Sequence, residues 1–171
     1  MPRLPAFLTH LHIRALGPVA SVPATEALRA SLGAFLGLAI AALVAMAFSP
    51  EKWASLYLIA PFGATAVLVF AAPNSPLAQP WPAIVGNTAS ALAAIALCHV
   101  ITNPLITVPL AVGLASVVMA MLRATHPPGG AVAMTVALGA ERILPHGFGF
   151  ALAPVAAGTI ILVITAAIYA H

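Results

Sequence analysis

The sequence predicts an all-α, polytopic membrane protein, and two observations lead to this fold class. First, 63% of its 171 residues are hydrophobic and 5% are charged, whereas a soluble domain is about 25% charged. Second, the charges are confined to short stretches, with none in 53–122 or 143–171. A soluble fold needs charge across its surface, so the bilayer is the solvent in which this chain is stable. The composition excludes a soluble enzyme.

Four stretches are apolar and long enough to be full transmembrane helices, which need about 20 residues each. Proline-rich or charged segments separate them, and Thr25 is a suitable N-cap for the first. The expected full helices cover residues 25–48, 83–101, 105–122 and 148–169.

Two further apolar segments are interrupted by proline and glycine. Proline removes a helical hydrogen bond and clashes with the preceding turn, so each segment is expected to be a broken start followed by a short half-helix. The half-helices are expected at 66–72 and 132–140. The interrupting residues are Pro61 and Gly63 in the first segment and Pro127, Pro128, Gly129 and Gly130 in the second.

The two halves of the chain repeat the order full helix, broken segment, full helix. The first half is 25–101 and the second is 105–169. Because each half has three segments, the second half starts from the opposite side of the membrane. This predicts a 3+3 inverted repeat, which transporters use to place a substrate site at the bilayer midplane.

The charge distribution predicts the orientation of the domain. Residues 1–24 are expected to form an N-terminal cytoplasmic or interfacial segment, and 25–171 the transmembrane domain. With six crossings, four arginines fall on the side of the N-terminus and two basic residues on the other, which the positive-inside rule assigns to a cytoplasmic N-terminus in a bacterial inner membrane. The basic residues are Arg3, Arg14, Arg29 and Arg123 on one side and Lys52 and Arg142 on the other.

The broken segments predict a site for a small anion. A half-helix that starts inside the membrane leaves its first N–H groups without helical partners and carries a partial positive charge at that end. Two such ends facing each other bind an anion without any buried lysine or arginine. The candidate substrate-binding residues are Gly63, Ala64, Thr65, Thr125, His126, Gly129 and Gly130, the structural breaks are Pro61, Pro127 and Pro128, and the lining or mouth residues are Gln79, Asn87 and Arg123.

Several of these side chains have a structural alternative. His126 either donates to an anion, relays a proton or gates the path, or it satisfies a neighbouring helix end. Thr65 either lines the site or bonds back to its own helix. Asn87 either faces a polar cavity or holds helices together. Arg123 either attracts anions or anchors the helix at the interface. Gln79 either closes a loop over the site or caps it.

Three motifs occur in order along the chain, namely LIAPFGATAVL at 58–68, SPLAQP at 75–80 and HPPGGA at 126–131. They resemble the integral membrane HPP family, named for its His-Pro-Pro motif, and the resemblance extends from about residue 24 onward. It implies a membrane transport protein, usually described with four spanning helices. Chloroplast and cyanobacterial relatives are described as nitrite transporters, so the resemblance implies nitrite-like cargo.

Other functional classes find little support in the sequence. The three acidic residues are unpaired and the single cysteine lies in an apolar run, and no metalloprotease, hydrolase or P-loop motif occurs. We therefore expect no enzyme, no metal, no cofactor and no nucleic-acid partner. The expected partners are the lipid bilayer, a small anion and further copies of the chain, because six short spans are few for a whole pathway. An intramembrane enzyme or a structural or interaction membrane protein is the alternative.

Overall fold

The computed structural model describes residues 22–48 and 59–170, and these residues form helices and turns without a strand. Four helices are long and apolar enough to cross a membrane, and two shorter apolar helices accompany them. This confirms the all-α membrane fold. The long ones are α2 (Ala24–Phe48), α5 (Pro80–Cys98), α6 (Pro104–Met121) and α9 (Ala157–Tyr169), which a π-helical turn (Ala151–Ala156) precedes, and the short ones are α4 (Ile59–Ala71) and α7 (Pro127–Leu138).

The two short helices begin earlier than the proline positions suggested. α4 is helical from Ile59, the first residue described after 49–58, so Pro61 and Gly63 both lie within it. α7 starts at Pro127, so the break before it is the extended stretch that ends at His126. Proline is tolerated in a first turn because the N–H that it lacks has no helical acceptor there. Pro127 and Pro128 therefore mark a helix start, and Pro61 does not break α4.

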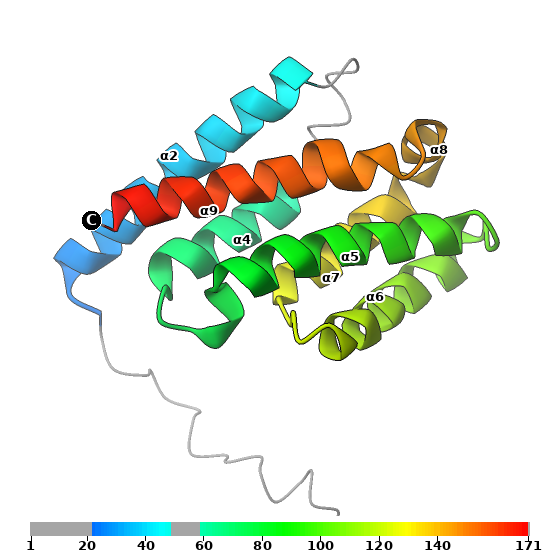
Figure 1. The fold of residues 1–171 in the computed structure, drawn as a ribbon, viewed down its shortest axis with the longest axis horizontal. Coiled ribbons are helices and arrows are strands. Elements are labelled where there is room, and N and C mark those ends of the chain that lie inside the picture. Colours follow the sequence, from blue (N-terminus) through cyan, green and yellow to red (C-terminus); the bar gives the residue numbers. More distant parts are fainter. Residues whose placement is uncertain (1–21, 49–58, 171) are drawn as a thin grey trace, which may run out of the picture.

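Successive helices run in alternating directions along one axis of the molecule (Figure 1). α2, α5 and α7 run one way, and α4, α6 and α9 run the other way. Each helix of the first half is therefore antiparallel to its counterpart in the second half, α2 to α6, α4 to α7 and α5 to α9. Figure 1 also shows the first residues of α2 and the end of α9 at the same end of the bundle.

The packing of the helices repeats with the same pairing. α2 packs on α4 and α9. Its counterpart α6 packs on α7 and α5, which are the counterparts of α4 and α9. The counterpart helices of each central pair, α4 with α7 and α5 with α9, also touch. The contacts of the second half thus repeat those of the first half in an approximate two-fold pattern.

A short sequence pattern marks equivalent places on α5 and on the helix that ends in α9. Both carry proline, three residues, glycine and then a polar side chain, as Pro82 to Asn87 and as Pro154 to Thr159. Each glycine allows a close approach from a short helix. A Cβ on Gly86 would lie 2.9 Å from His126 Cβ, and a Cβ on Gly158 would overlap the ring of Phe62.

The last long helix is kinked near its start. Ala153 has non-helical dihedrals (φ −111°, ψ 42°), directly before Pro154. The missing N–H and the ring of proline disturb the preceding turn, which accounts for the kink. It separates the π-helical turn from the regular helix that carries Thr159.

The outer faces of the helices are apolar. α2 exposes large side chains along most of its length, and α6 does so at both of its ends. In water such a surface would be unfavourable, so these faces contact the lipid bilayer. Examples are Leu28, Leu32, Phe35 and Leu43 on α2 and Leu105 and Met121 on α6.

Candidate functional site

Polar side chains from the short and long helices meet in the interior, in what we call the polar cluster. It consists of Thr65 on α4, Asn87 and Ser90 on α5, His126 before α7 and Thr159 on α9, each 0% exposed. Buried polar groups are costly in an apolar medium unless they are hydrogen-bonded. All members except Ser90 are joined by hydrogen bonds to one another, and those bonds join both halves of the chain.

Asn87 is the centre of the polar cluster. Its Nδ2 donates to Thr65 Oγ1 at 3.1 Å and to Thr159 Oγ1 at 3.2 Å. Both threonine hydroxyls also bond back to their own helices, to Pro61 O at 3.0 Å and Val155 O at 2.8 Å. One amide group thus links α4, α5 and α9.

His126 connects the polar cluster to the connector between α4 and α5. Its Nε2 lies 3.1 Å from Thr65 Oγ1, and its Nδ1 lies 2.8 Å from the carbonyl oxygen of Leu77. Leu77 belongs to a 3₁₀ turn (Pro76–Ala78) that Ser75 caps. The carbonyl oxygen of Leu77 only accepts hydrogen bonds, so Nδ1 must donate to it. Together with Thr65 at Nε2, this contact holds the imidazole ring from two sides.

Two atoms of the polar cluster have no hydrogen-bond partner among the described residues. They are Asn87 Oδ1 and Ser90 Oγ, one turn apart on α5. An unpaired polar atom in a buried place costs about 1–3 kcal/mol. Asn87 Oδ1 can accept a further hydrogen bond, and Ser90 Oγ can donate or accept one.

The start of α7 has fewer free donors than expected. Pro127 and Pro128 have no N–H, and the N–H of Gly129 donates to His126 O at 2.8 Å. The backbone donors that the sequence suggested for an anion are thus missing or already bonded. Donors at this end must instead come from side chains, of which His126 is the nearest.

Gly129 serves a close helix contact. A Cβ on Gly129 would lie 2.8 Å from both Ser90 Oγ and Met119 Sδ, and 3.1 Å from Gly86 O. Real Cβ atoms almost never approach other atoms so closely. Glycine at this position therefore lets α7 lie directly against α5. Gly130, in contrast, has only Val112 Cγ1 at 3.7 Å, which is an ordinary contact.

Arg123 ends α6 in a left-handed conformation with φ 51°. Its N–H donates to Ala120 O and the N–H of Ala124 donates to Met119 O, at 3.1 and 2.8 Å, which is a Schellman ending. The side chain is exposed. This turn presses Ala124 O against α5, 2.5 Å from where a Cβ of Gly86 would lie.

Gly63 and Ala64 lie on the outside of the pair formed by α4 and α7. They line an open groove of about 570 Å³ together with the His-Pro-Pro prolines. Its lining is apolar, and Thr125, next to it in sequence, is exposed. The groove is lined by Gly63, Ala64, Val67, Leu68, Pro127, Pro128 and Ala131.

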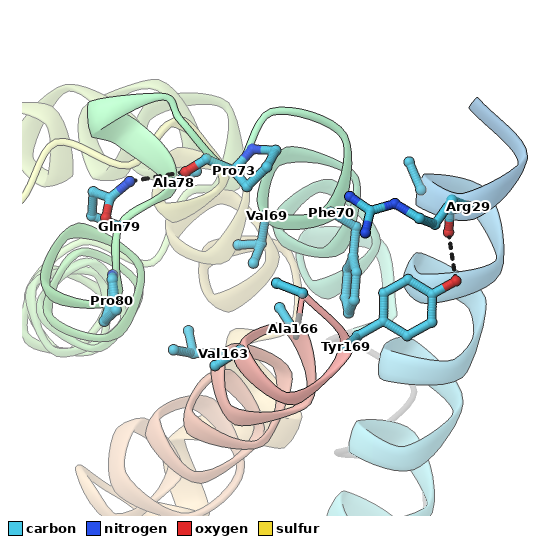
Figure 2. A pocket seen from close by; sticks show the side chains of 13 residues that line it. Arg29, Val69, Phe70, Pro73, Ala78, Gln79, Pro80, Val163, Ala166 and Tyr169 are labelled. Carbon is cyan, nitrogen blue, oxygen red and sulfur yellow. Dashed lines mark hydrogen bonds between the residues drawn. The ribbon is translucent and has the colours of Figure 1, made fainter. Parts of the chain in front are cut away.

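A second cavity, which we call the vestibule, has a volume of about 190 Å³ and opens at the end of the bundle where α2 begins (Figure 2). Its inner walls lie next to the polar cluster: Val69 and Val163 are one helical turn beyond Thr65 and Thr159, and Ala78 follows Leu77. Its rim is polar, with Arg29, Gln79 and Tyr169. The vestibule therefore leads toward the polar cluster and is separated from it by a small apolar layer.

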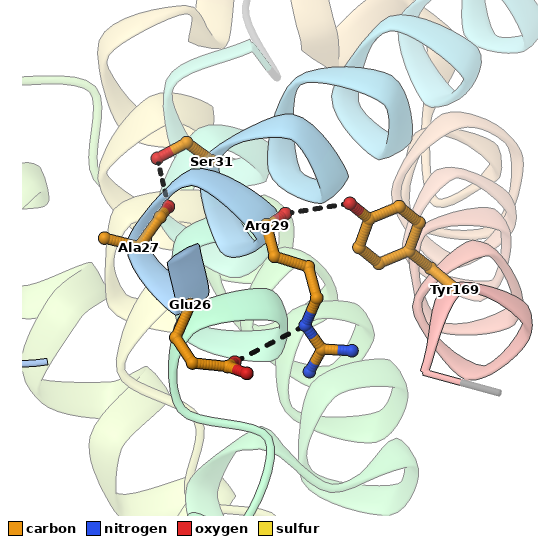
Figure 3. A network of polar contacts seen from close by, with 5 residues as sticks. All are labelled: Glu26, Ala27, Arg29, Ser31 and Tyr169. Atoms are coloured by element: carbon orange, nitrogen blue, oxygen red, sulfur yellow. Dashed lines mark hydrogen bonds and ion pairs between the residues drawn. The ribbon is translucent and has the colours of Figure 1, made fainter. Parts of the chain in front are cut away.

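The rim of the vestibule carries one polar contact between α2 and α9 and an ion pair within α2 (Figure 3). Tyr169 donates its hydroxyl to Arg29 O at 3.0 Å, and Arg29 Nε pairs with Glu26 at 3.4 Å. Both charged side chains are about half exposed, at 53% and 55%, so this ion pair contributes little to stability. Gln79 donates to Pro73 O and Ser75 O at 2.9 and 3.1 Å and so folds its connector beside the cavity.

Sequence reasoning singled out four residues that the structure brings to the polar cluster or the vestibule, namely Thr65, Asn87, His126 and Gln79. It did not include Thr159, Ser90, Arg29 or Tyr169 among the site residues. The repeated proline–glycine–polar pattern on α5 and α9 would have indicated Thr159. Among the described residues no group of three His, Cys, Asp or Glu side chains is placed to hold a metal ion.

Comparison with known proteins gives the family. The model of the HPP transmembrane region matches residues 19–171. Two transmembrane proteins of Dictyostelium discoideum are 37% identical over 141 residues and 34% identical over 139 residues. These alignments cover 80% and 79% of this chain but 45% and 48% of the relatives, so the chain spans about half of their length. No solved structure matches. With its His-Pro-Pro motif before α7 and its match over most of the sequence, the chain belongs to the HPP transmembrane family.

Proposed function

We propose that this protein is a membrane transporter or channel for a small inorganic anion such as nitrite. The observation that carries the proposal is the polar cluster, a buried set of hydroxyl, amide and imidazole groups between two antiparallel halves. In a membrane protein such groups are rare unless they serve a substrate or a helix contact. Ser90 Oγ, a buried hydroxyl without a partner among the described residues, can donate to a bound anion and supports a substrate.

The charge of the site favours an anion. Ser90 offers a free hydroxyl donor, whereas the donors of Asn87 and His126 are already bonded to Thr65, Thr159 and Leu77. The acidic residues among the described ones, Glu26 and Glu141, are exposed. A small anion beside Ser90 would meet a donor without a carboxylate to repel it. Arg29 at the rim of the vestibule adds a cation on the approach.

The route in this proposal runs through the vestibule to the polar cluster. Every member of the cluster is 0% exposed, so this conformation is closed at both ends. Passage requires Val69, Ala78 and Val163 to separate, which a tilt of α4 against α9 would achieve. Transporters with inverted repeats commonly open at one end and then at the other, and the opposite end stays closed each time. The choice between channel and carrier depends on whether both ends open together.

Reconstitution tests the proposal. Purified protein in vesicles should take up nitrite faster than protein-free vesicles, which are needed as a reference because nitrous acid crosses bilayers unaided. Ser90→Ala removes a buried hydroxyl beside the site, and Ser116→Ala removes an exposed one that bonds to its own α6. We expect Ser90→Ala to slow uptake by about tenfold, equivalent to about 1.4 kcal/mol, and Ser116→Ala to leave it unchanged. Uptake equal to that of protein-free vesicles would exclude the function.

Orientation and assembly are part of the same proposal. We place the N-terminus in the cytoplasm of a bacterial inner membrane, which puts Arg29 and Arg123 on the cytoplasmic side. Fluorescent or alkaline phosphatase fusions to each end of the chain would report the side of the membrane. We also propose a homo-oligomer, and light scattering of the detergent-solubilised protein would measure the number of protomers.

A further inference from the structure

We propose that a proton is the ion that accompanies the anion, that it binds at Nε2 of His126, and that the hydroxyl of Thr65 turns to accommodate it. This rests on the proposed transport of an anion and names its coupling. One proton would move with each monovalent anion, so transport would carry no net charge.

The proposal begins with the imidazole ring of His126. Its Nδ1 lies 2.8 Å from Leu77 O, and a carbonyl oxygen only accepts, so Nδ1 carries a hydrogen. The second nitrogen, Nε2, lies 3.1 Å from Thr65 Oγ1. A hydroxyl both donates and accepts, so Nε2 is free to be bare or protonated. Nδ1 is thus fixed as a donor by Leu77, whereas Nε2 can change its protonation beside Thr65.

The hydroxyl of Thr65 has one hydrogen and two candidate acceptors. They are Pro61 O at 3.0 Å and His126 Nε2 at 3.1 Å, while Asn87 Nδ2 donates to the same oxygen at 3.1 Å. When Nε2 is bare, the hydroxyl donates to it. When Nε2 is protonated, Nε2 donates to Thr65 and the hydroxyl turns to Pro61 O. Both protonation states therefore keep the ring hydrogen-bonded without moving a helix.

The proton adds to His126 without any covalent rearrangement elsewhere. A proton from the aqueous phase forms the Nε2–H bond, the hydrogen of Thr65 stays on its oxygen, and the ring becomes a cation. Release reverses these steps on the other side. The positive charge gained equals the negative charge of the bound anion, so the loaded site is neutral.

No other described charge is placed to neutralise that cation. The elements packed around His126 are α4, α5, α6, α7 and the 3₁₀ turn. Within them or just after their ends, the charged or titratable side chains besides His126 itself are Cys98, His99 and Arg123. Cys98 and His99 lie at the far end of α5, about 18 Å along the helix by its rise per residue, and Arg123 is exposed. A buried imidazolium without a counter-ion is strongly unfavourable. The anion is therefore the partner that makes protonation favourable, and the two bind cooperatively.

A direct measurement of the ring tests the proton site. The full-length protein, labelled with ¹⁵N in its histidine rings, is placed in vesicles, and subtraction of the His126→Gln spectrum isolates one ring among six histidines. At about pH 7.5 without nitrite we expect a hydrogen on Nδ1 alone, and with nitrite a hydrogen on both nitrogens. A ring whose protonation is the same with and without nitrite, from about pH 8 to about pH 5.5 on either side of the ordinary value of about 6.5, would overturn the proposal.

Flux measurements test the coupling. We expect nitrite uptake to acidify the vesicle interior, to rise as external pH falls, and not to respond to a membrane potential set by potassium and valinomycin. Thr65→Val, which keeps the side-chain shape but loses the hydroxyl, should slow uptake and flatten its pH response, and Thr65→Ser should restore both. Thr88→Val is the matched control, because Thr88 bonds only to Ile84 O on its own helix.

The outcomes separate the two proposals. Nitrite uptake that carries net current, or that keeps its pH response in His126→Gln, would overturn the proton coupling and leave transport intact. A ring that gains its proton with nitrite while no uptake occurs would retain the proton site and remove the transport function.

Discussion

Asn87 on α5 donates to Thr159 on α9 across 3.2 Å, and the two side chains occupy equivalent places in the two halves of the chain. The same Nδ2 also donates to Thr65. A single amide thus joins the halves and reaches the ring of His126 through one hydroxyl.

The Asn87–Thr159 contact predicts a coupling energy between the halves. Hydrogen bonds between membrane helices are worth about 0.6 kcal/mol on average and up to about 1.7. In a double-mutant cycle of Asn87→Ala and Thr159→Val, unfolding in detergent should show a coupling of about 1 kcal/mol. In the control cycle, which pairs Asn87→Ala with Thr88→Val, the losses of unfolding free energy should be additive. Additivity in both cycles would mean that the contact does not bind the halves together.

The two neighbouring glycines of the His-Pro-Pro-Gly-Gly motif should respond oppositely to alanine. Gly129→Ala forces a Cβ to within 2.8 Å of Ser90 Oγ and Met119 Sδ, and such overpacking costs about 1–3 kcal/mol. Gly130→Ala meets only Val112 Cγ1 at 3.7 Å and should stabilise the helix by up to about 1 kcal/mol. Melting temperatures of the two variants in the same detergent provide the comparison. Equal destabilisation would contradict the packing described for α7.

The left-handed residue Arg123 predicts a separation of backbone and charge effects. A side chain at φ 51° costs about 1–2 kcal/mol relative to glycine. Arg123→Gly should therefore be more stable than Arg123→Ala by about 1 kcal/mol, although both lack the charge. If the guanidinium also attracts anions, both variants should lose nitrite uptake equally. A loss in Arg123→Ala alone would assign the effect to the turn.

The rim of the vestibule predicts opposite effects for the two members of an ion pair. Arg29→Gln removes the cation beside the cavity and should raise the KM for nitrite by several-fold and weaken its dependence on salt. Glu26→Gln removes the neighbouring negative charge and should lower the KM. Arg142→Gln, an exposed arginine at the other end of the bundle, is the control for charge alone. Identical KM values in Arg29→Gln and the wild type would remove Arg29 from the approach path.

The fold class could be predicted from sequence because hydropathy and charge confinement act over whole helices. The four long helices are confirmed for this reason, to within a few residues at their ends. The starts of α4 and α7 were placed too late, because proline both breaks a helix and begins one, and only its neighbours decide which. Residues 1–21, 49–58 and 171 lie outside the described residues, and with them most of the predicted N-terminal segment and the basic residues Arg3, Arg14 and Lys52.

The polar cluster could be predicted only in part. Thr65, Asn87 and His126 stand out because polar side chains are rare in this sequence. Their contact depends on how α4, α5 and the 3₁₀ turn meet, and local sequence does not contain that information. The role of Gly129 differs from the predicted one for the same reason. A glycine that lets a ligand approach and a glycine that lets a helix approach look alike in sequence until the neighbouring helix is placed.

The lengths of α4 and α7 have a consequence for the surrounding lipid. The described part of α4 has 13 residues and α7 has 12, which span about 20 and 18 Å, whereas the hydrocarbon layer is about 30 Å thick. Such hydrophobic mismatch is relieved by local thinning of the bilayer around the shorter elements. The apolar groove between α4 and α7 lies on the outside of this pair, where acyl chains would have to shorten or tilt. The thickness of the host membrane therefore acts on α4, which carries Thr65, and on α7, which follows His126.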